Sequence, residues 1–146
     1  MTAPLVTRPH GFNFWAPVTN SGDNKLYTYQ QNGNIGTLKH ITVSHEPSYW
    51  VGDRGNWEYM VNTSIDPNGT GSIGANERAA KFSHENETAK AHYYGVEFNE
   101  GNAQGAKLEL SPTMHGSATR FKFNDNAKYH NVILDTVRGS DKKLVL

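Results

Sequence analysis

The chain has 146 residues, a length typical of one domain, and it contains no cysteine, which excludes a disulfide framework, a zinc ribbon and a thiol nucleophile. It carries 14 lysines and arginines against 14 aspartates and glutamates, so its formal net charge is zero. This balance argues against nucleic acid or an anionic membrane as the main partner, and no apolar run is long enough to cross a bilayer. We therefore expect residues 1–146 to form a single domain.

The first half of the chain holds short candidate strands that are separated by aromatic and glycine-rich loops. Residues 66–74 include a proline, an asparagine, three glycines and a threonine, a composition typical of a surface loop. A single turn over 75–80 is the best helix candidate. Apolar and β-branched residues predict strands near 25–30, 38–44, 56–62 and 78–83.

The second half alternates apolar and polar residues with a period of two, which is typical of half-buried β-strands. Segments rich in asparagine, aspartate and glycine separate these runs, and such residues favour tight turns. The alternation predicts strands over 94–98, 106–110 and 119–123 and a further strand over 131–137, with turns at 99–102 and 124–126.

Many short strands and little helix predict an all-β fold, namely an antiparallel β-sandwich with long aromatic and glycine-rich loops. Both ends of the chain look truncated: an aromatic cluster that includes Phe12 and Trp15 lies close to the start, and the last residues are Leu144-Val145-Leu146. We expect this apolar end to be a strand that continues into further sequence. An uncovered sheet edge and a net charge near zero also predict that the isolated chain self-associates.

Residues 44–55 are the densest stretch of polar and aromatic side chains in the sequence. Sugars are bound by side chains of these kinds, because an aromatic face stacks on the C–H side of a pyranose while carboxylates, amides and arginine bond its hydroxyls. The alternative is a structured loop whose aromatic pair, Tyr49 and Trp50, closes the end of the sandwich. The candidate sugar-binding residues are Trp15, His45, Glu46, Trp50, Asp53 and Arg54.

The run His84-Glu85-Asn86-Glu87 superficially resembles a set of metal ligands. It lacks the spacing of a zinc site, so we expect hydrogen bonding at a corner between a strand and a loop, with calcium binding by Glu85 or Glu87 as the alternative. No motif marks two acids as the carboxyl pair that a glycosidase requires. The sequence therefore predicts no catalytic residue and no metal ligand in this chain.

Three blocks of the sequence resemble, in order, the N-terminal domain of glycoside hydrolase family 92, a family of calcium-dependent exo-α-mannosidases that are mostly bacterial. They are residues 11–20 (GFNFWAPVTN), 44–54 (SHEPSYWVGDR) and 82–94 (FSHENETAKAHYY), and residues 111–113 and 120–123 follow in the expected order. The chain departs from the family at its front, where a short segment replaces a glycine-rich stretch.

The resemblance implies a β-sandwich that docks on a C-terminal (α/α)6 catalytic domain of the same protein. In the family that second domain holds the general acid, the general base and most of the calcium ligands, and the reaction proceeds with inversion. The sandwich lends residues to the rim of the mannose pocket. The chain would then be a partial N-terminal domain that is inactive alone and needs no cofactor of its own.

The parent protein implied by the resemblance is an exo-acting α-mannosidase with α-1,2 preference, which uses calcium and cleaves α-mannosides of N-glycans or mannan. We expect such a parent to be secreted, periplasmic or on the surface of a bacterium, although this chain begins without an export signal. The alternatives are a free-standing carbohydrate-binding module or lectin, and an assembly domain without a ligand.

Overall fold

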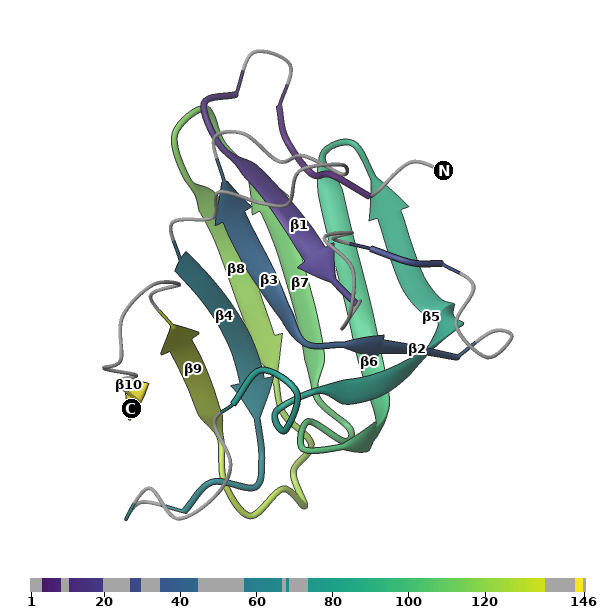
Figure 1. The fold of residues 1–146 in the computed structure, drawn as a ribbon, viewed down its shortest axis with the longest axis vertical. Coiled ribbons are helices and arrows are strands. Elements are labelled where there is room, and N and C mark those ends of the chain that lie inside the picture. Colours follow the sequence, from purple (N-terminus) through teal and green to yellow (C-terminus); the bar gives the residue numbers. More distant parts are fainter. Residues whose placement is uncertain are drawn as a thin grey trace.

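The computed structural model describes residues 4–8, 11–19, 27–29, 35–44, 57–66, 68, 74–135 and 144–145, and the statements below concern these residues. They form two five-stranded antiparallel sheets that pack face to face (Figure 1). No helix occurs in this part of the chain. The predicted all-β sandwich is confirmed.

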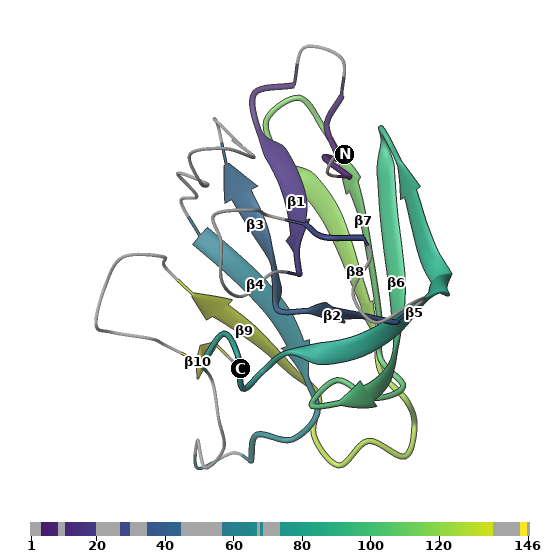
Figure 2. The same cartoon turned by 45° about the vertical axis from the view of Figure 1, so that its right-hand side comes forward.

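Sheet A has the strand order β1-β3-β4-β9-β10, and sheet B has the order β2-β5-β6-β7-β8. Strands β1, β3 and β4 lie in front of β7 and β8 in both views of the ribbon (Figures 1 and 2). The strands of sheet A are β1 Phe14–Val18, β3 His40–Ser44, β4 Trp57–Asn62, β9 Asn131–Asp135 and β10 Leu144–Val145. Those of sheet B are β2 Ile35–Leu38, β5 Ala80–Lys90, β6 Tyr93–Gly101, β7 Lys107–Pro112 and β8 Ser117–Lys122.

The hydrophobic core fills the space between the two sheets. The alternation seen in the sequence places Tyr94, Val96 and Phe98 of β6 on the inner face, where all three are buried. Sheet A contributes alternate residues of its own strands to the same core, because every second side chain faces inward. These are Trp15, Ile41, Val43, Tyr59 and Val61.

Three predictions for the first half are wrong in detail. The strand expected over 38–44 divides at Lys39 into β2 and β3, which belong to different sheets. The single helical turn expected over 75–80 is a hydrogen-bonded turn in which Arg78 N–H donates to Gly74 O, and the chain enters β5 at Ala80. Of the strand expected over 25–30, Tyr27 to Tyr29 are not strand, and the other three residues lie outside the described part.

Strand β5 contains a large bulge that the sequence did not predict. Phe82 pairs with Phe98 and Glu87 pairs with Val96, so five steps along β5 are opposed by two steps along β6. The extra residues reset the register, and Glu87 consequently shares the inner side of the sheet with Val96. The run His84 to Glu87 thus lies within a bulged strand, and its expected place at a corner between a strand and a loop is wrong.

The turn between β6 and β7 depends on two glycines. Gly101 and Gly105 have φ angles of +90° and +73°, which side chains with a Cβ rarely adopt. Gly105 N–H donates to Phe98 O and Ala106 N–H donates to Ala103 O, which closes the turn. It therefore follows the position expected at 99–102 by a few residues, because β6 continues to Gly101.

Candidate functional site

One end of the sandwich brings together segments that are far apart in the sequence. Phe14 pairs with Ser44 and Val43 pairs with Trp57, so β1, β3 and β4 reach this end together. The β7–β8 hairpin joins them, because Phe12 N–H donates to Met114 O at 2.8 Å and the Asn13 side-chain amide donates to His115 O at 2.9 Å. We call this end of the molecule the sandwich end.

The sandwich end contains a pocket of about 410 Å³. Its volume lies within the range of about 300–1,000 Å³ in which small-molecule sites are usually found. Its walls combine indole rings with backbone and polar groups of the hairpin, which is the composition expected for a ligand with both apolar and polar faces. The lining residues of this end pocket are Asn13, Trp15, Val43, Trp57, His115, Gly116 and Ser117.

Trp15 is the one predicted site residue that the structure describes. Its side chain lines the end pocket but is only 1% exposed, since most of it packs in the core. The buried indole Nε1–H of Trp15 has no hydrogen-bond partner among the described residues. A buried donor without a partner costs about 1–3 kcal/mol, so this N–H is an unsatisfied polar group within the packed sandwich.

The other predicted residues, His45, Glu46, Trp50, Asp53 and Arg54, lie outside the described residues. Their segment leaves sheet A after Ser44 and re-enters it at Trp57. Val43 and Trp57 are register partners and both line the end pocket, so the segment is attached at the pocket on both sides. This attachment brings the start of the predicted loop to Trp15.

The sequence did not identify four other pocket residues, namely Asn13, Trp57, His115 and Ser117. A lone histidine such as His115, close to the end of a strand, is by default a structural residue. A signal for Trp57 was present, since a tryptophan at the start of a strand beside the polar segment is a natural platform for a sugar. No local pattern indicates Asn13 or Ser117, because their proximity arises from the contact between the hairpin and the segment before β1.

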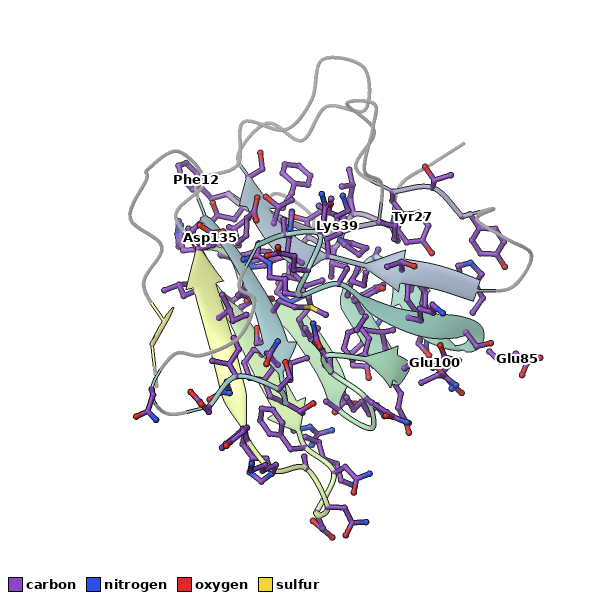
Figure 3. The ribbon with its side chains drawn as sticks, turned by 60° about the horizontal axis from the view of Figure 1, so that its bottom comes forward. Phe12, Tyr27, Lys39, Glu85, Glu100 and Asp135 are labelled. Atoms are coloured by element: carbon purple, nitrogen blue, oxygen red, sulfur yellow. The ribbon has the colours of Figure 1, made fainter. Side chains whose placement is uncertain are left out.

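Two large apolar side chains beside the end pocket are exposed. Phe12 is 62% exposed and Met114 is 57% exposed, and the rings of Phe12 and His115 lie 6.1 Å apart. Figure 3 labels Phe12 at the periphery of the molecule. Adjacent exposed apolar groups around a pocket are typical of an interaction surface.

A second polar cluster surrounds Glu87 in the bulge of β5. The hydroxyl groups of Tyr27 and Tyr94 donate to its carboxylate at 2.7 and 2.8 Å, and His84 Nδ1 lies 2.6 Å from Glu87 Oε2. Burial raises the pKa of Tyr27 and of Tyr94, and the neighbouring Glu87 raises both further, so the two hydroxyls stay protonated as donors. The hydrogen-bonding role predicted for this run is confirmed.

The Glu87 cluster also secures a neighbouring segment. His84 Nε2 lies 2.8 Å from Tyr29 O, and the rings of Tyr29 and His84 stack with centroids 4.0 Å apart. Tyr27 and Tyr29 are thereby held against β5 from a segment that is not itself a strand. We interpret the cluster as structural, because its carboxylate is surrounded by donors from the protein itself.

A buried ion-pair network covers the outer face of sheet A, on the side away from the core. Arg78 Nη2 lies 2.6 Å from Glu58 Oε2, and Arg78 Nη1 lies 3.0 Å from Asp135 Oδ2. His40 Nδ1 is 3.1 Å from the same Glu58 oxygen. Burial lowers the pKa of His40 to about 3, and Arg78 and Lys39 contribute in the same direction. Figure 3 shows Asp135 and Lys39 on the same side of the molecule.

No carboxyl pair suited to hydrolysis is evident in the described part of the chain. Glu58 and Asp135 bond Arg78, Glu87 bonds the two tyrosines, and Glu109 bonds Arg120. Among the described residues there is also no group of three or more histidines and acids that could hold a metal ion. No helix in the same residues is long and apolar enough to cross a membrane.

Comparison with known proteins agrees with this architecture. The Glycosyl hydrolase family 92 N-terminal domain matches residues 1–144. No curated protein matches the sequence. The chain is similar to the family GH92 inverting mannosidase of Bacteroides thetaiotaomicron VPI-5482, with a TM-score of 0.67 and 29% identity over 91% of this chain and 16% of that one.

A family GH92 alpha-mannosidase from Bacteroides thetaiotaomicron shares the fold, with a TM-score of 0.70 and 21% identity over 92% of this chain and 18% of that one. A further gh92 family glycosyl hydrolase has a TM-score of 0.65 and 19% identity over 90% of this chain and 17% of that one. The chain thus spans less than a fifth of the length of these solved structures.

Proposed function

The chain belongs to the N-terminal domains of glycosyl hydrolase family 92, and from this premise we propose that its sandwich end forms part of the rim of the mannose pocket in an exo-acting α-mannosidase. The observation that carries the proposal is the convergence at the end pocket of Trp15, the hairpin residue His115 and both attachment points of residues 45–56. The remaining wall would come from the C-terminal catalytic domain.

Three features of the sandwich end support contact with a second domain and a sugar. The exposed apolar side chains Phe12 and Met114 flank the pocket and offer surface that another domain can cover. The ring of Trp57, which is partly exposed, provides an apolar wall suited to a pyranose. The side chains of His115 and Ser117, which also line the pocket, provide hydrogen-bonding groups for sugar hydroxyls.

We assign this chain a binding and orienting role, because hydrolysis with inversion requires an acid and a base that the family resemblance places in the catalytic domain. One carboxylic acid must protonate the leaving oxygen, and a carboxylate about 6.5–9.5 Å away must activate water on the opposite face of the sugar. The carboxylates of Glu58, Glu87, Glu109 and Asp135 are each bonded to donors of the sandwich itself. We therefore assign the acid, the base and the calcium ion to the catalytic domain, where calcium would act as a Lewis acid toward sugar oxygens.

The finer parts of the proposal concern the substrate and the compartment. We propose α-1,2-linked mannosides of N-glycans or mannan as substrates, with His45, Glu46, Trp50, Asp53 and Arg54 bonding or stacking on the sugar. The parent would act outside the cytoplasm, in the periplasm, on the cell surface or in the medium. These parts rest on the resemblance of residues 44–54 to the family, since the segment lies outside the described residues.

The experiment that tests the proposal compares two exposed histidines in the full-length parent enzyme. His115→Ala removes a side chain from the end pocket, whereas His130→Ala removes one that stacks on Phe123 away from the pocket. We expect His115→Ala to lower kcat/KM for an α-1,2-mannobiose about tenfold, equivalent to about 1.4 kcal/mol of transition-state stabilisation. His130→Ala should leave it within about twofold. Equal effects of the two substitutions would show that the end pocket is remote from the substrate.

The isolated chain provides a second test. Incubated with calcium and an aryl α-mannoside, it should show no turnover above the uncatalysed rate, because the proposal assigns the acid and the base to the catalytic domain. Turnover that disappears in Glu46→Gln or Asp53→Asn would make this chain an enzyme by itself and would contradict the proposal.

A further inference from the structure

The outer face of sheet B carries a small depression that is separate from the end pocket. It has a volume of about 260 Å³, near the lower limit of about 300 Å³ for ligand sites, so it would accommodate a single small ring. Its base consists of small side chains, since Ser111 and Ala118 are register partners on β7 and β8. The lining residues are Tyr93, Glu109, Leu110, Ser111, Ala118, Thr119 and Arg120.

The ring of Tyr93 lies over a glycine on the same strand. A Cβ placed at Gly95 would be 2.6 Å from Tyr93 Oη and 3.0 Å from Tyr93 Cζ, so only glycine leaves room for the ring. One side of the ring is therefore against the backbone of β6, and the other side is left for a ligand. An aromatic ring that packs on a sheet in this way can serve as a platform for the C–H face of a sugar.

Glu109 holds the polar parts of the depression in place. It accepts a hydrogen bond from Tyr93 Oη at 2.7 Å, and Arg120 Nε and Nη2 reach its other oxygen at 2.7 and 2.6 Å. The hydrogen bonds from Tyr93 and Arg120 lower the pKa of Glu109 to about 2, so it remains a carboxylate at neutral pH. Because Glu109 sits opposite both Gly95 and Arg120 in the sheet, it orients the aromatic and cationic groups together.

The remaining hydrogen-bonding capacity of the site faces outward. Arg120 uses two of its five N–H groups on Glu109, and its side chain is 76% exposed. Tyr93 Oη donates to Glu109, and Ser111 Oγ donates to His92 O. Each of these two oxygens can still accept a hydrogen bond from a ligand hydroxyl. Glu109 offsets part of the positive charge of Arg120 and of Lys107, whose Nζ lies 3.4 Å from Glu109 Oε1.

We propose that this depression, the sheet B platform, binds one neutral pyranose ring, with its C–H face on Tyr93 and its hydroxyls on Arg120, Ser111 and Tyr93 Oη. Glu109 is a positioning residue that keeps the platform organised before the sugar arrives. The site would hold a sugar outside the end pocket. It does not depend on the proposed contact between the sandwich end and a catalytic domain.

The test is a titration of the ¹⁵N-labelled chain with methyl α-mannopyranoside, followed by two-dimensional NMR. We expect saturable shifts of the Tyr93, Gly95, Ser111 and Arg120 amides with a Kd of about 1–10 mM, the affinity of a shallow site for one small ring. Shifts that cluster instead at Asn13, Trp57 and His115 would place the sugar in the end pocket and overturn the platform. The absence of saturable shifts at the four platform amides would overturn it as well.

Matched variants separate stacking from organisation. Tyr93→Ala should weaken binding at least about tenfold because it removes the stacking face, and Tyr93→Phe should weaken it less because the ring remains. Ala118→Gln fills the depression without changing Tyr93 and should also weaken binding at least about tenfold. Tyr129→Ala, which removes a partly exposed tyrosine away from the platform, is the control and should bind like the parent chain. Unchanged affinity in both Tyr93→Ala and Ala118→Gln would refute the proposal.

Discussion

Two arginine networks lie on opposite outer faces of the sandwich, and they differ mainly in their access to water. On sheet A the Arg78 side chain is 0% exposed and bonds Glu58 and Asp135. On sheet B the Arg120 side chain is 76% exposed and bonds Glu109. The distances from guanidinium nitrogen to carboxylate oxygen, between 2.6 and 3.0 Å, are alike in the two networks.

The comparison shows that contact geometry alone does not decide what an ion pair contributes. An exposed arginine that loses its partner returns to water, so its pair is worth about 0–1 kcal/mol. A buried arginine that loses its partner cannot reach water. Removal of a buried arginine likewise costs free energy, because the buried carboxylates lose the positive charge that it supplies. The Arg78 network therefore stabilises the fold, whereas Arg120 remains available for a ligand. The predictions below test this difference, beginning with the largest effect.

Replacement of Arg78 should have the largest consequence. We expect Arg78→Ala to lower the free energy of unfolding by about 3–5 kcal/mol, because it removes the buried guanidinium that both Glu58 and Asp135 bond. Urea denaturation followed by circular dichroism measures the change. Combining Arg78→Met with Glu58→Gln and Asp135→Asn should recover much of the loss, since no uncompensated charge would then remain. A loss below about 1 kcal/mol in Arg78→Ala would mean that burial does not distinguish the two networks.

His40 should make the stability of the sheet A network depend on pH. Its pKa is lowered from 6.5 to about 3 in the folded chain, so the unfolded chain binds a proton first as the pH falls. The contribution of neutral His40 to the free energy of unfolding is complete above pH 6.5 and is lost progressively toward pH 3. The loss between pH 7 and pH 5 amounts to about 2 kcal/mol. Urea denaturation at the two pH values measures it.

The matched variant for this prediction is His40→Gln, which retains a donor for Glu58 without a titrating group. Between pH 7 and pH 5 the free energy of unfolding should fall in both proteins. The fall in His40→Gln should be smaller than the fall in the parent chain, and the difference between the two falls should be about 2 kcal/mol. An identical pH dependence in the two proteins would show that other groups account for the acid sensitivity.

Replacement of Arg120 should have the smallest effect on stability. Arg120→Ala is expected to change the free energy of unfolding by less than about 1 kcal/mol, and this difference should shrink further in 1 M salt, which screens exposed charges. Denaturation at low and high salt checks both parts. A loss as large as that in Arg78→Ala would show that Glu109, which has a side chain only 12% exposed, behaves as a buried charge.

Much of sheet B was predictable because its strands obey a local rule. A period of two places Tyr94, Val96 and Phe98 on one side of a strand whatever its neighbours are, and apolar burial then selects that side for the core. The same reasoning located β7, β8 and β9 to within a few residues. It failed for β1, where Trp15, Ala16 and Val18 are all buried, because both faces of that strand are covered and no alternation remains.

The candidate site was predictable only in part. Trp15 lies at a pocket, and the segment that holds the other predicted residues is attached beside it through Val43 and Trp57. The contribution of His115 was missed because the hairpin that carries it is about a hundred residues from Asn13 in the chain. The division of 38–44 at Lys39 was missed as well, since a change of sheet leaves no mark in the hydrophobic pattern.

The sequence by itself determined the features that depend on neighbours along the chain: the all-β class, the alternating strands of sheet B and the ordered blocks shared with family 92. Tertiary structure alone decided which distant groups meet. Arg78 bonds Asp135, which lies 57 residues away along the chain. The bulge in β5 places Glu87 within hydrogen-bond distance of Tyr27, which is 60 residues away. Such pairings follow from register and packing, in which each strand's position depends on every other strand, and a local pattern carries no record of them.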